Sequence, residues 1–326
     1  MKVSARDIAK AAQTSVASVS RAFRPDSPMS KDLRARILSV AQEMGYLPPG
    51  GRVSKKTGRM SLSLVVGDIR NPYYAFVLDA FSQAAAEMGI ELFFHVVPSG
   101  KTVDATMHQV FSARTDGVIV TAAPLNSELA GQCRTRGLPV VLFGRVQVDS
   151  DLTAISGDNY SGGRQVAERF LSQGRNRIAF LGGEPKASTH LERRSGFLDL
   201  LEEAGAGLFA EYRGGFSYDI AHDIAAGQTE AQQRPDAIFC ANDIMAFGVL
   251  DAMRRAGMDP GADIAVIGYD DVPMAAWHCY RLTTVRQQAR QMVREALGVK
   301  PGLIADQEPQ GRIIITPCDL IERDSG

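Results

Sequence analysis

The chain has 326 residues, of which 45% are hydrophobic and 22% are charged, and its formal net charge at pH 7 is −1. This length suggests two or three domains, and the composition is that of a globular protein rather than a disordered one. No apolar run reaches the roughly 18 residues that a membrane span needs, and the first residues contain no apolar signal-peptide centre. We therefore expect a cytoplasmic protein that makes no membrane contact.

The four cysteines, Cys133, Cys240, Cys279 and Cys318, are far apart and form no CxxC pair. This spacing indicates neither a disulfide framework nor a zinc site. Cys279 lies beside His278 and could ligate a metal, whereas a reduced thiol with no ligand is the simpler alternative. The sequence thus predicts no metal.

Charge is distributed unevenly along the chain. Residues 1–60 contain 12 Lys and Arg against 4 Asp and Glu, whereas residues 61–326 contain 24 basic and 33 acidic residues. A basic segment on an acidic body is the electrostatic pattern expected of a protein that binds a polyanion. A solvated basic surface without a partner remains the alternative on charge alone.

Three short helices are predicted in the basic segment. Ser4 followed by Asp7 fits a capping box, and apolar residues then recur at helical spacing. Ser15 is expected to cap a second helix after a break at Gln13 and Thr14. A third helix is expected from Ser30, with Gly45 at its C-terminal end. Two short helices joined by a tight turn and braced by a third match the helix-turn-helix plan, although a small helical cap without a ligand has the same pattern.

The second helix of a helix-turn-helix presents its first residues to the major groove. Val16 and Ala17 can make apolar contacts with thymine methyl groups, and Arg21 can make a bidentate bond to guanine. Small hydroxyl side chains nearby suit phosphates or base edges. The predicted DNA contacts in this segment are Ser4, Thr14, Ser15, Val16, Ala17, Ser18, Ser20, Arg21 and Ser30.

The amino-acid sequence of this segment resembles the headpiece of the lactose/galactose repressor (LacI/GalR) family. The resemblance is carried by DIAKAAQTSVASVSRAF and SKDLRARILSVAQEMGYLP, and it runs from about Val3 to Pro48. It implies that Val16, Ala17 and Arg21 read bases in operator DNA. Gln13 stands where the family usually has a turn glycine, so some strain is expected there.

A linker with the sequence PPGGRVSKKTGRM follows the headpiece. Its Pro and Gly content predicts flexibility, whereas the family folds this stretch into a helix whose leucine wedges into the minor groove. The expected leucine position falls near Lys55, and Val53 is the only aliphatic substitute. Arg52 and Lys55 are predicted phosphate contacts, with Val53 beside them.

The remainder of the chain alternates apolar strands with amphipathic helices. Buried parallel strands are predicted at 61–67, 91–97, 117–121, 139–143, 177–183, 210–215, 236–242 and 263–269, and helices at 73–88, 102–114 and 126–137. This alternation predicts an α/β fold with two doubly wound parallel sheets. Ligands of such sheets bind outside the carboxyl ends of the strands, so a cleft between two lobes is the expected small-molecule site.

The core also resembles the family's effector domain, which is related to periplasmic sugar-binding proteins. The resemblance rests on NPYY at 71–74, RRSGF at 193–197, FCANDIMAFGVL at 239–250, VIGYDD at 266–271, LTTVRQ at 282–287 and ITPCDLIERDS at 315–325. It implies that Arg193 is the effector-binding arginine. Aromatic faces and polar side chains at strand ends suit a sugar-like ligand. The predicted effector contacts are Asp68, Tyr73, Tyr74, Arg145, Thr189, Arg193, Phe216, Asn242 and Asp270.

For most of these residues a purely structural role is the competing interpretation. Tyr73, Tyr74 and Phe216 could serve lobe packing, Asn242 and Asp270 could cap helices, and Arg193 could cap a loop.

The predicted domains are a headpiece at 1–48, a hinge at 49–60 and a core at 61–326. The first lobe of the core is expected at about 61–158 and 284–311, and the second at about 159–283 and 312–326. The resemblance implies a homodimer on a pseudo-palindromic operator, and no leucine heptad follows the last strand.

The prediction is therefore a transcriptional regulator, most simply a repressor, whose operator affinity is controlled by an effector. A solute-binding protein with the same core and no DNA role is the first alternative. An enzyme on a Rossmann-like sheet is the second, but no GxGxxG or GxxxxGK[ST] loop and no catalytic constellation is present, so no cofactor is expected.

Overall fold

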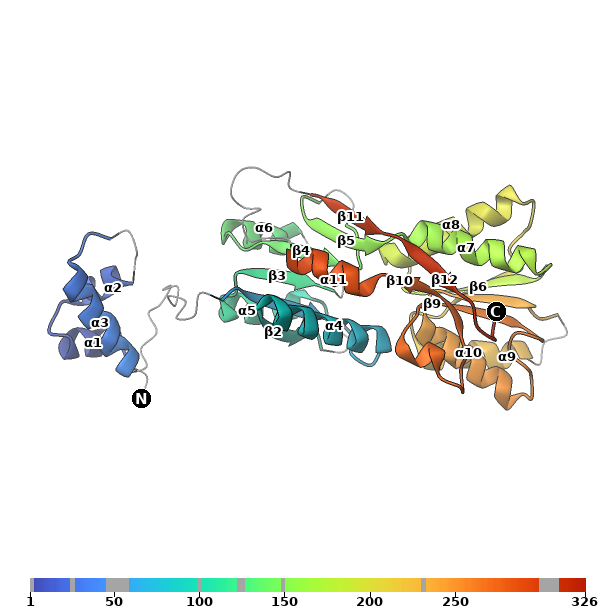
Figure 1. Cartoon of the computed structure of the whole chain (residues 1–326), viewed down its shortest axis with the longest axis horizontal. Coiled ribbons are helices and arrows are strands. Elements are labelled where there is room, and N and C mark those ends of the chain that lie inside the picture. The colour runs from blue at the N-terminus through green and yellow to red at the C-terminus, as the bar shows by residue number, and fades with distance from the viewer. Residues whose placement is uncertain are drawn as a thin grey trace. The chain divides into compact units, whose positions relative to one another are not determined.

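A computed structural model describes residues 3–23, 27–44, 59–98, 101–121, 127–147, 150–229, 233–298 and 311–326 of the chain. The chain divides into two compact units, residues 1–59 and 60–326, which we call the headpiece and the core. Figure 1 draws the helices and strands of both units.

The headpiece contains three helices, α1 (Ala5–Ala11), α2 (Val16–Ala22) and α3 (Lys31–Glu43). Their apolar faces meet in a small core in which Ile8, Val19 and Ile37 are each at most 1% exposed. This core has few members, so local signals at the helix ends contribute much of what defines the fold.

Those local signals lie where the sequence predicts them. The backbone N–H and the hydroxyl of Ser4 both donate to the Asp7 carboxylate, at 2.8 and 2.7 Å. The Ser15 hydroxyl accepts a hydrogen bond from the Ser18 backbone N–H at 3.0 Å and so caps α2. Gln13, in the turn between them, has φ of +49°, a left-handed conformation that favours glycine. The strain predicted at this turn is thus present.

The first lobe of the core is built on a six-stranded parallel sheet in the order β11-β5-β4-β3-β1-β2. Helices α4 and α11 cover one face over a core that contains Phe81 and Met292, and α5 and α6 cover the other over a core that contains Met107 and Cys133. The elements of this lobe are β1 (Ser61–Val66), α4 (Pro72–Met88), β2 (Glu91–Val96), α5 (Asp104–Ala113), β3 (Gly117–Val120), α6 (Ser127–Thr135), β4 (Val140–Phe143), β5 (Thr153–Gly157), α11 (Ala289–Gly298) and β11 (Ile313–Thr316).

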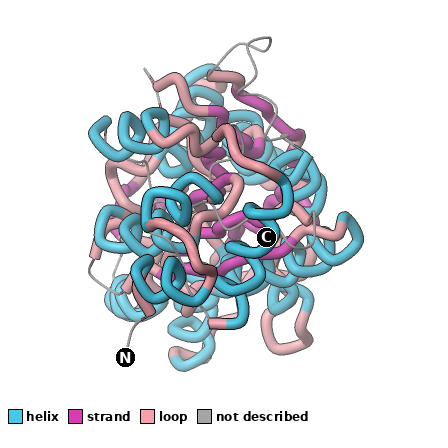
Figure 2. The backbone as a smooth tube through the Cα atoms, turned by 90° about the vertical axis from the view of Figure 1, so that its left-hand side faces the viewer, coloured by secondary structure: helices cyan, strands magenta, loops and turns pink. Residues whose placement is uncertain are grey.

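The second lobe is built on a sheet in the order β12-β10-β9-β8-β6-β7, parallel except for the antiparallel edge strand β12. Helices flank its strands, as they flank those of the first lobe (Figure 2). The elements are α7 (Asn159–Ser172), β6 (Ile178–Gly182), α8 (Ser188–Glu203), β7 (Ala210–Arg213), α9 (Tyr218–Thr229), β8 (Ala237–Cys240), α10 (Asp243–Arg255), β9 (Ala265–Asp270), the 3₁₀ helix η1 (Pro273–Ala276), β10 (Thr283–Gln287) and β12 (Cys318–Ile321).

The chain crosses between the lobes three times, after β5, after β10 and between β11 and β12. In Figure 1, β11 and β12 form an almost continuous ribbon from one lobe to the other. The crossings touch one another: a Cβ on Gly157 would lie 2.9 Å from the Cys318 sulfur and 3.1 Å from Gln287 Oε1. Only glycine fits at this contact, which makes it the natural hinge between the lobes.

The predicted fold class is confirmed, and the differences are local. Strands β5, β10, β11 and β12 were not anticipated, and each carries Ser, Thr, Gln or Asp among its apolar residues. The chain stays in the second sheet through Gln287, at the end of β10, and in the first sheet through Thr316, at the end of β11. The lobe crossings after these two strands therefore lie four and five residues later than predicted.

Strand β2 corrects a further expectation. The sequence predicts a buried strand, but Phe93, Phe94 and Val96 are 38, 50 and 45% exposed. The strand is at the edge of its sheet and pairs only with β1. The described residues of this chain therefore leave three apolar side chains of β2 exposed.

Candidate functional site

The headpiece presents most of its predicted DNA contacts to solvent. Arg21 and Val16 are exposed, and Val16 is a large apolar side chain that nevertheless exposes 45% of its surface. Thr14 and Ser18 are half-buried, and the other predicted contacts are exposed, namely Ser4, Ser15, Ala17, Ser20 and Ser30. An exposed aliphatic residue at the start of this helix is free to contact a groove that presents methyl groups.

Several of the hydroxyl groups also have structural partners. Ser4, Ser15 and Ser30 each lie just before a helix and hydrogen-bond within its first turn. Helix N-termini attract phosphate groups through their free N–H groups, so capping and phosphate contact are compatible. Arg52, Val53 and Lys55, with the predicted hinge and Gly45, lie outside the described residues.

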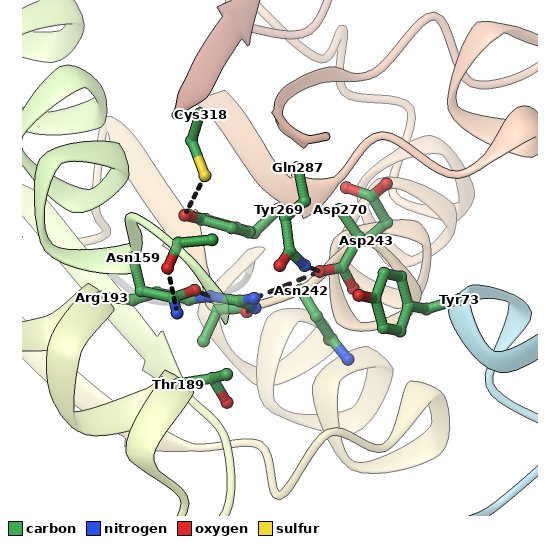
Figure 3. Close-up of polar contacts among 12 residues, drawn as sticks. Tyr73, Asn159, Thr189, Arg193, Asn242, Asp243, Tyr269, Asp270, Gln287 and Cys318 are labelled. Atoms are coloured by element: carbon green, nitrogen blue, oxygen red, sulfur yellow. Dashed lines mark hydrogen bonds and ion pairs between the residues drawn. The ribbon is translucent and has the colours of Figure 1, made fainter. Parts of the chain in front are cut away.

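Arg193 is the centre of the predicted effector site. It lies on α8 and is 3% exposed, and each of its guanidinium nitrogens donates a hydrogen bond. Nε donates to Asn159 Oδ1 at 2.9 Å, Nη1 donates to the Ala241 carbonyl, and Nη2 donates to Asp270 Oδ1 at 3.3 Å. Its plane stacks 3.6 Å from the ring centroid of Tyr269 (Figure 3). A buried arginine held on all sides is a rigid, preorganised donor.

Asp270 faces Arg193 from the carboxyl end of β9. Its φ is +121°, and that of Asp271 is +49°, so both residues adopt a conformation that L-residues rarely take. Such backbone strain is concentrated at functional sites. Asp270 caps no helix: its carboxylate accepts from Arg193 and, at 2.7 Å, from Gln287 Nε2. The strand end thus aims a carboxylate into the site.

A second carboxylate, Asp243, lies beneath Asp270. The Thr284 hydroxyl donates to its Oδ1 at 2.5 Å and the Val272 backbone N–H to its Oδ2 at 2.9 Å. Burial raises the pKa of the Asp243 carboxyl, and the negative charge of Asp270 raises it further. Burial also raises the pKa of Asp270, which Arg193 and Gln287 partly offset. Two acids and one arginine share this pocket, so the site favours holding a proton.

Tyr73 enters the site from the other lobe. It is the second residue of α4, where Asn71 caps the helix by accepting from the Tyr73 backbone N–H at 3.0 Å. Its ring packs against the apolar cores of both lobes, and its hydroxyl is buried without a hydrogen-bond partner among the described residues. Figure 3 shows it reaching toward the acidic side chains. A buried hydroxyl left without a partner is costly, so a ligand that bonds to it would be favoured.

Three more predicted residues connect the lobes beside this centre. Arg145, after β4, donates from Nη1 to the Thr189 hydroxyl at 2.7 Å and lies 5.7 Å from the ring of Phe216. Phe216 has φ of +58°, and its ring occupies the space that a side chain at Gly183 would need. The strained turn therefore directs the aromatic ring inward.

Asn242 caps α10 through Oδ1, which accepts from the Met245 backbone N–H at 3.2 Å. Asn242 therefore has the helix-capping role that was its alternative interpretation. It also follows Ala241, whose carbonyl accepts from Arg193, so it lies at the Arg193 site. Two predicted contacts lie apart from this centre. Asp68 forms an exposed ion pair with Arg70 at 2.5 Å, and Tyr74 packs on the core of the first lobe with its ring edge-on to Tyr73.

Sequence reasoning missed Asn159, Asp243, Tyr269 and Gln287. Gln287 ends β10 and Asp243 begins the helix α10 that follows β8, both within quoted motifs, so the strand-end rule could have found them. Asn159 follows β5, a strand that the apolar pattern did not reveal. Tyr269 lies inside a buried strand, where sequence shows no difference between a core ring and a platform for an arginine.

The described part of the chain was also compared with the requirements of a metal site and of a membrane helix. Among the described residues, no group of three or more His, Cys, Asp or Glu could hold a metal ion, and Cys279 is an exposed free thiol. No helix in the described ranges is long and apolar enough to cross a membrane.

Comparison with known proteins assigns a class to each part of the chain. Residues 4–49 match the family of bacterial regulatory proteins called the lacI family, and residues 167–326 match the periplasmic binding protein-like domain. The transcriptional repressor CytR of Escherichia coli (strain K12) is 25% identical over 324 residues, which are 98% of this chain and 95% of that protein. A PurR repressor of Pectobacterium carotovorum is 28% identical over 332 residues, 98% of this chain and 96% of that protein.

Solved structures share the fold. A lac repressor dimer bound to operator and the anti-inducer ONPF superposes with a TM-score of 0.74 at 23% identity, over 100% of this chain and 99% of that one. A complex of the transcriptional regulator CelR with cellobiose has a TM-score of 0.71 at 24% identity, over the full length of both chains.

A helix-turn-helix headpiece joined to a two-lobed periplasmic-binding-protein-like core defines a DNA-binding transcriptional regulator. Residues 4–49 belong to the lacI family of bacterial regulatory proteins, and the chain is a DNA-binding transcriptional repressor with this arrangement of domains. The relatives named above are repressors and not enzymes, so the prediction of a regulator rather than an enzyme is confirmed.

Proposed function

We propose that this repressor binds a small cyclic effector between the lobes of its core, and that the effector changes its affinity for operator DNA. The observation that carries the proposal is the buried Arg193–Asp270 pair at the carboxyl ends of the second sheet. It faces the unpartnered hydroxyl of Tyr73 from the first lobe. A ligand that bonds to both lobes stabilises one angle between them.

The chemistry of the site favours a sugar or sugar derivative. Arg193 donates, Asp270 accepts, and Tyr73 can do either, which suits vicinal hydroxyl groups on one edge of a ring. Tyr73 and Phe216 offer apolar faces for the CH side of that ring. The cellobiose complex of CelR is consistent with this choice. A nucleobase is the second candidate, because aromatic faces and a donor–acceptor edge also suit a planar heterocycle.

For DNA, we propose that Val16, Ala17 and Arg21 contact bases and that the surrounding hydroxyl groups position the headpiece on phosphates. Arg21 is the strongest candidate for sequence reading, because its guanidinium can bind guanine O6 and N7 together. Arg52 and Lys55 of the linker would add phosphate contacts, which supply affinity without sequence information.

We further propose that the repressor is a homodimer whose second copy covers the exposed face of β2. An edge strand with exposed Phe93, Phe94 and Val96 invites association, and monomeric proteins usually protect such edges. Twofold symmetry would present two headpieces to a pseudo-palindromic operator. The measured mass of Phe94→Lys in solution should fall to that of a monomer, whereas a dimeric variant would contradict this interface.

A gel-shift series at increasing salt tests the DNA function. A steep loss of affinity with salt, together with preference for one operator over unrelated DNA, supports the proposal. Absence of DNA binding under all conditions would overturn it.

A thermal-shift panel of sugars, sugar acids, nucleosides and nucleobases tests the effector function. A compound present at 100 times its Kd should stabilise the core by about 2.7 kcal/mol. Arg193→Ala should abolish the shift and spare operator binding, whereas Arg194→Ala, next to it on α8 and paired with Glu211 at the surface, should keep the shift. An intact shift in Arg193→Ala would show that this site is wrongly assigned.

A further inference from the structure

Asn159 is the first residue of α7 and lies two residues after Gly157, where the lobe crossings touch. The strand before it, β5, belongs to the first lobe, and the helix that it begins belongs to the second. Its side chain is 1% exposed, although an amide in such a place must satisfy a donor and an acceptor inside the protein. The contacts that satisfy them connect the effector site to the lobe crossing at Gly157.

The two ends of this amide face in different directions. Oδ1 accepts from Arg193 Nε at 2.9 Å. Nδ2 lies 3.0 Å from the Gly157 carbonyl oxygen and 3.1 Å from Ser156 Oγ, at the end of the first-lobe strand. Nδ2 also donates to Glu192 Oε2 at 3.0 Å. One short side chain thus holds the effector-binding arginine and the backbone of the crossing (Figure 3).

The chemistry requires an amide at this position. Its neighbours are a guanidinium that only donates, and a carboxylate and a carbonyl that only accept. A carboxylate at residue 159 would accept from Arg193 but would repel Glu192 and leave the Gly157 carbonyl without a donor. An aliphatic residue of the same size would break both contacts. Glutamine would move the amide by one methylene away from the partners that Asn159 reaches at 2.9–3.1 Å.

We propose that Asn159 is the positioning residue that transmits a displacement of Arg193 to the interlobe crossing at Gly157. This inference rests on the proposed effector function of the same site. An effector that draws Arg193 toward itself pulls on Nε, and Asn159 passes that displacement to the last residues of β5. The lobes rotate about this crossing, so the lobe angle responds to the occupancy of the site.

The connection can be tested without an effector by hydrogen exchange on the full-length protein. The readout is exchange of the backbone amides at 154–158, the end of β5. We expect Arg193→Lys to accelerate it about tenfold, because lysine cannot hold the same three acceptors. Asn159→Leu should have a similar effect alone. In the double variant Arg193→Lys should add less than about twofold, since coupled residues are non-additive.

Two controls make the result interpretable. Asn176→Asp changes an exposed asparagine of the same lobe and should leave exchange at β5 unchanged. If Asn159→Leu does not fold, Asn159→Asp combined with Glu192→Gln replaces it. That pair keeps an acceptor for Arg193 Nε and removes the repulsion, but no donor reaches the Gly157 carbonyl. Arg193→Lys should then leave β5 exchange unchanged.

Additive effects of Arg193→Lys and Asn159→Leu at β5, or no change there in Asn159→Leu, would overturn the proposal. In the replacement background, acceleration by Arg193→Lys as large as in the wild type would do the same. These measurements contain neither effector nor DNA. A failed thermal-shift panel or gel-shift series therefore contradicts the proposed function and leaves this result independent of it.

Discussion

The headpiece and the effector site are built by opposite means. In the headpiece, the contacts that define the DNA surface join residues three positions apart, such as Ser4 with Asp7 and Ser15 with Ser18. In the effector site, Arg193 contacts a residue 34 positions before it and another 77 positions after it. One surface is defined by local capping, and the other exists only after two lobes and three crossings have formed.

The two regions also differ in how strongly water weakens their interactions. Arg21 is exposed, so solvent screens its charge and its removal leaves the fold unharmed. Arg193 and Asp270 have side chains that are 4 and 6% exposed. Charges at that depth depend on each other, because each loses its hydration on burial. The headpiece can therefore vary its recognition residues at low cost, whereas the core cannot.

The largest expected effect is on the core. Arg193→Ala leaves the Asp270 carboxylate buried without its cation and should lower the free energy of unfolding by about 3–5 kcal/mol. Urea denaturation measures this, with Arg194→Ala as the neighbouring surface control, which should cost much less because water screens its ion pair. If both variants cost the same, the contrast between buried and exposed charges fails.

The second effect is a dependence of core stability on pH. Burial raises the pKa values of Asp243 and Asp270 above the ordinary 3.8, so the folded core binds more protons than the unfolded chain above that pH. Stability is then fully present at low pH and falls as pH rises toward the raised values, by about 1.4 kcal/mol per pH unit and proton.

Asp243→Asn removes one of the two acids and should flatten this slope by roughly half. Unfolding free energies measured from pH 4 to 8 give the slope. An Asp243→Asn slope as steep as that of the wild type would contradict the assignment, and this comparison cancels the opposite contribution of His95 and His190, whose pKa values burial lowers.

The third effect should be confined to DNA binding. Arg21→Ala removes the guanidinium that we assign to guanine and should weaken operator binding by about 1–3 kcal/mol. Fluorescence anisotropy on operator and unrelated DNA measures it, and discrimination between the two should shrink. Unfolding of the core should not change. Equal weakening on both DNAs would instead make Arg21 a phosphate contact.

The smallest effect concerns the turn of the headpiece. Gln13→Gly relieves the left-handed backbone at φ +49°, which costs an L-residue about 1–2 kcal/mol, but it also frees the unfolded chain. A net gain of about 0.5 kcal/mol is expected, visible as slower amide exchange in α1 and α2. A loss of stability would show that the glutamine side chain supplies a contact that offsets the strain.

The apolar pattern predicted the fold class and eight strands, because central parallel strands are buried on both faces and contain few polar residues. It failed where a strand is short or at an edge. β5 reads TAISG and was overlooked, and β2 was expected to be buried although it is exposed. In β5 the Thr and Ser interrupt the apolar run although the strand lies inside its sheet, and for β2 the pattern lacks the information, since burial of an edge depends on what lies beside it.

The effector site was also predicted only in part. Arg193, Asp270 and Tyr73 meet in one place in the structure, and Asp68 and Tyr74 lie apart from it. Strand-end position identifies candidates, but it does not show which of them face the same cleft. Gln287 ends a strand and Asp243 begins the helix that follows one, and only their contacts with Asp270 and Thr284 distinguish them.

The sequence alone therefore determined the helix-turn-helix, its caps, the strained turn at Gln13 and the two-lobed α/β plan, because these follow from neighbouring residues and from periodic burial. The tertiary structure decided the partners of Arg193, the meeting of three crossings at Gly157 and the place of Asn159 between them. Those contacts join residues dozens of positions apart, and residue type and spacing do not state which distant groups will share one desolvated site.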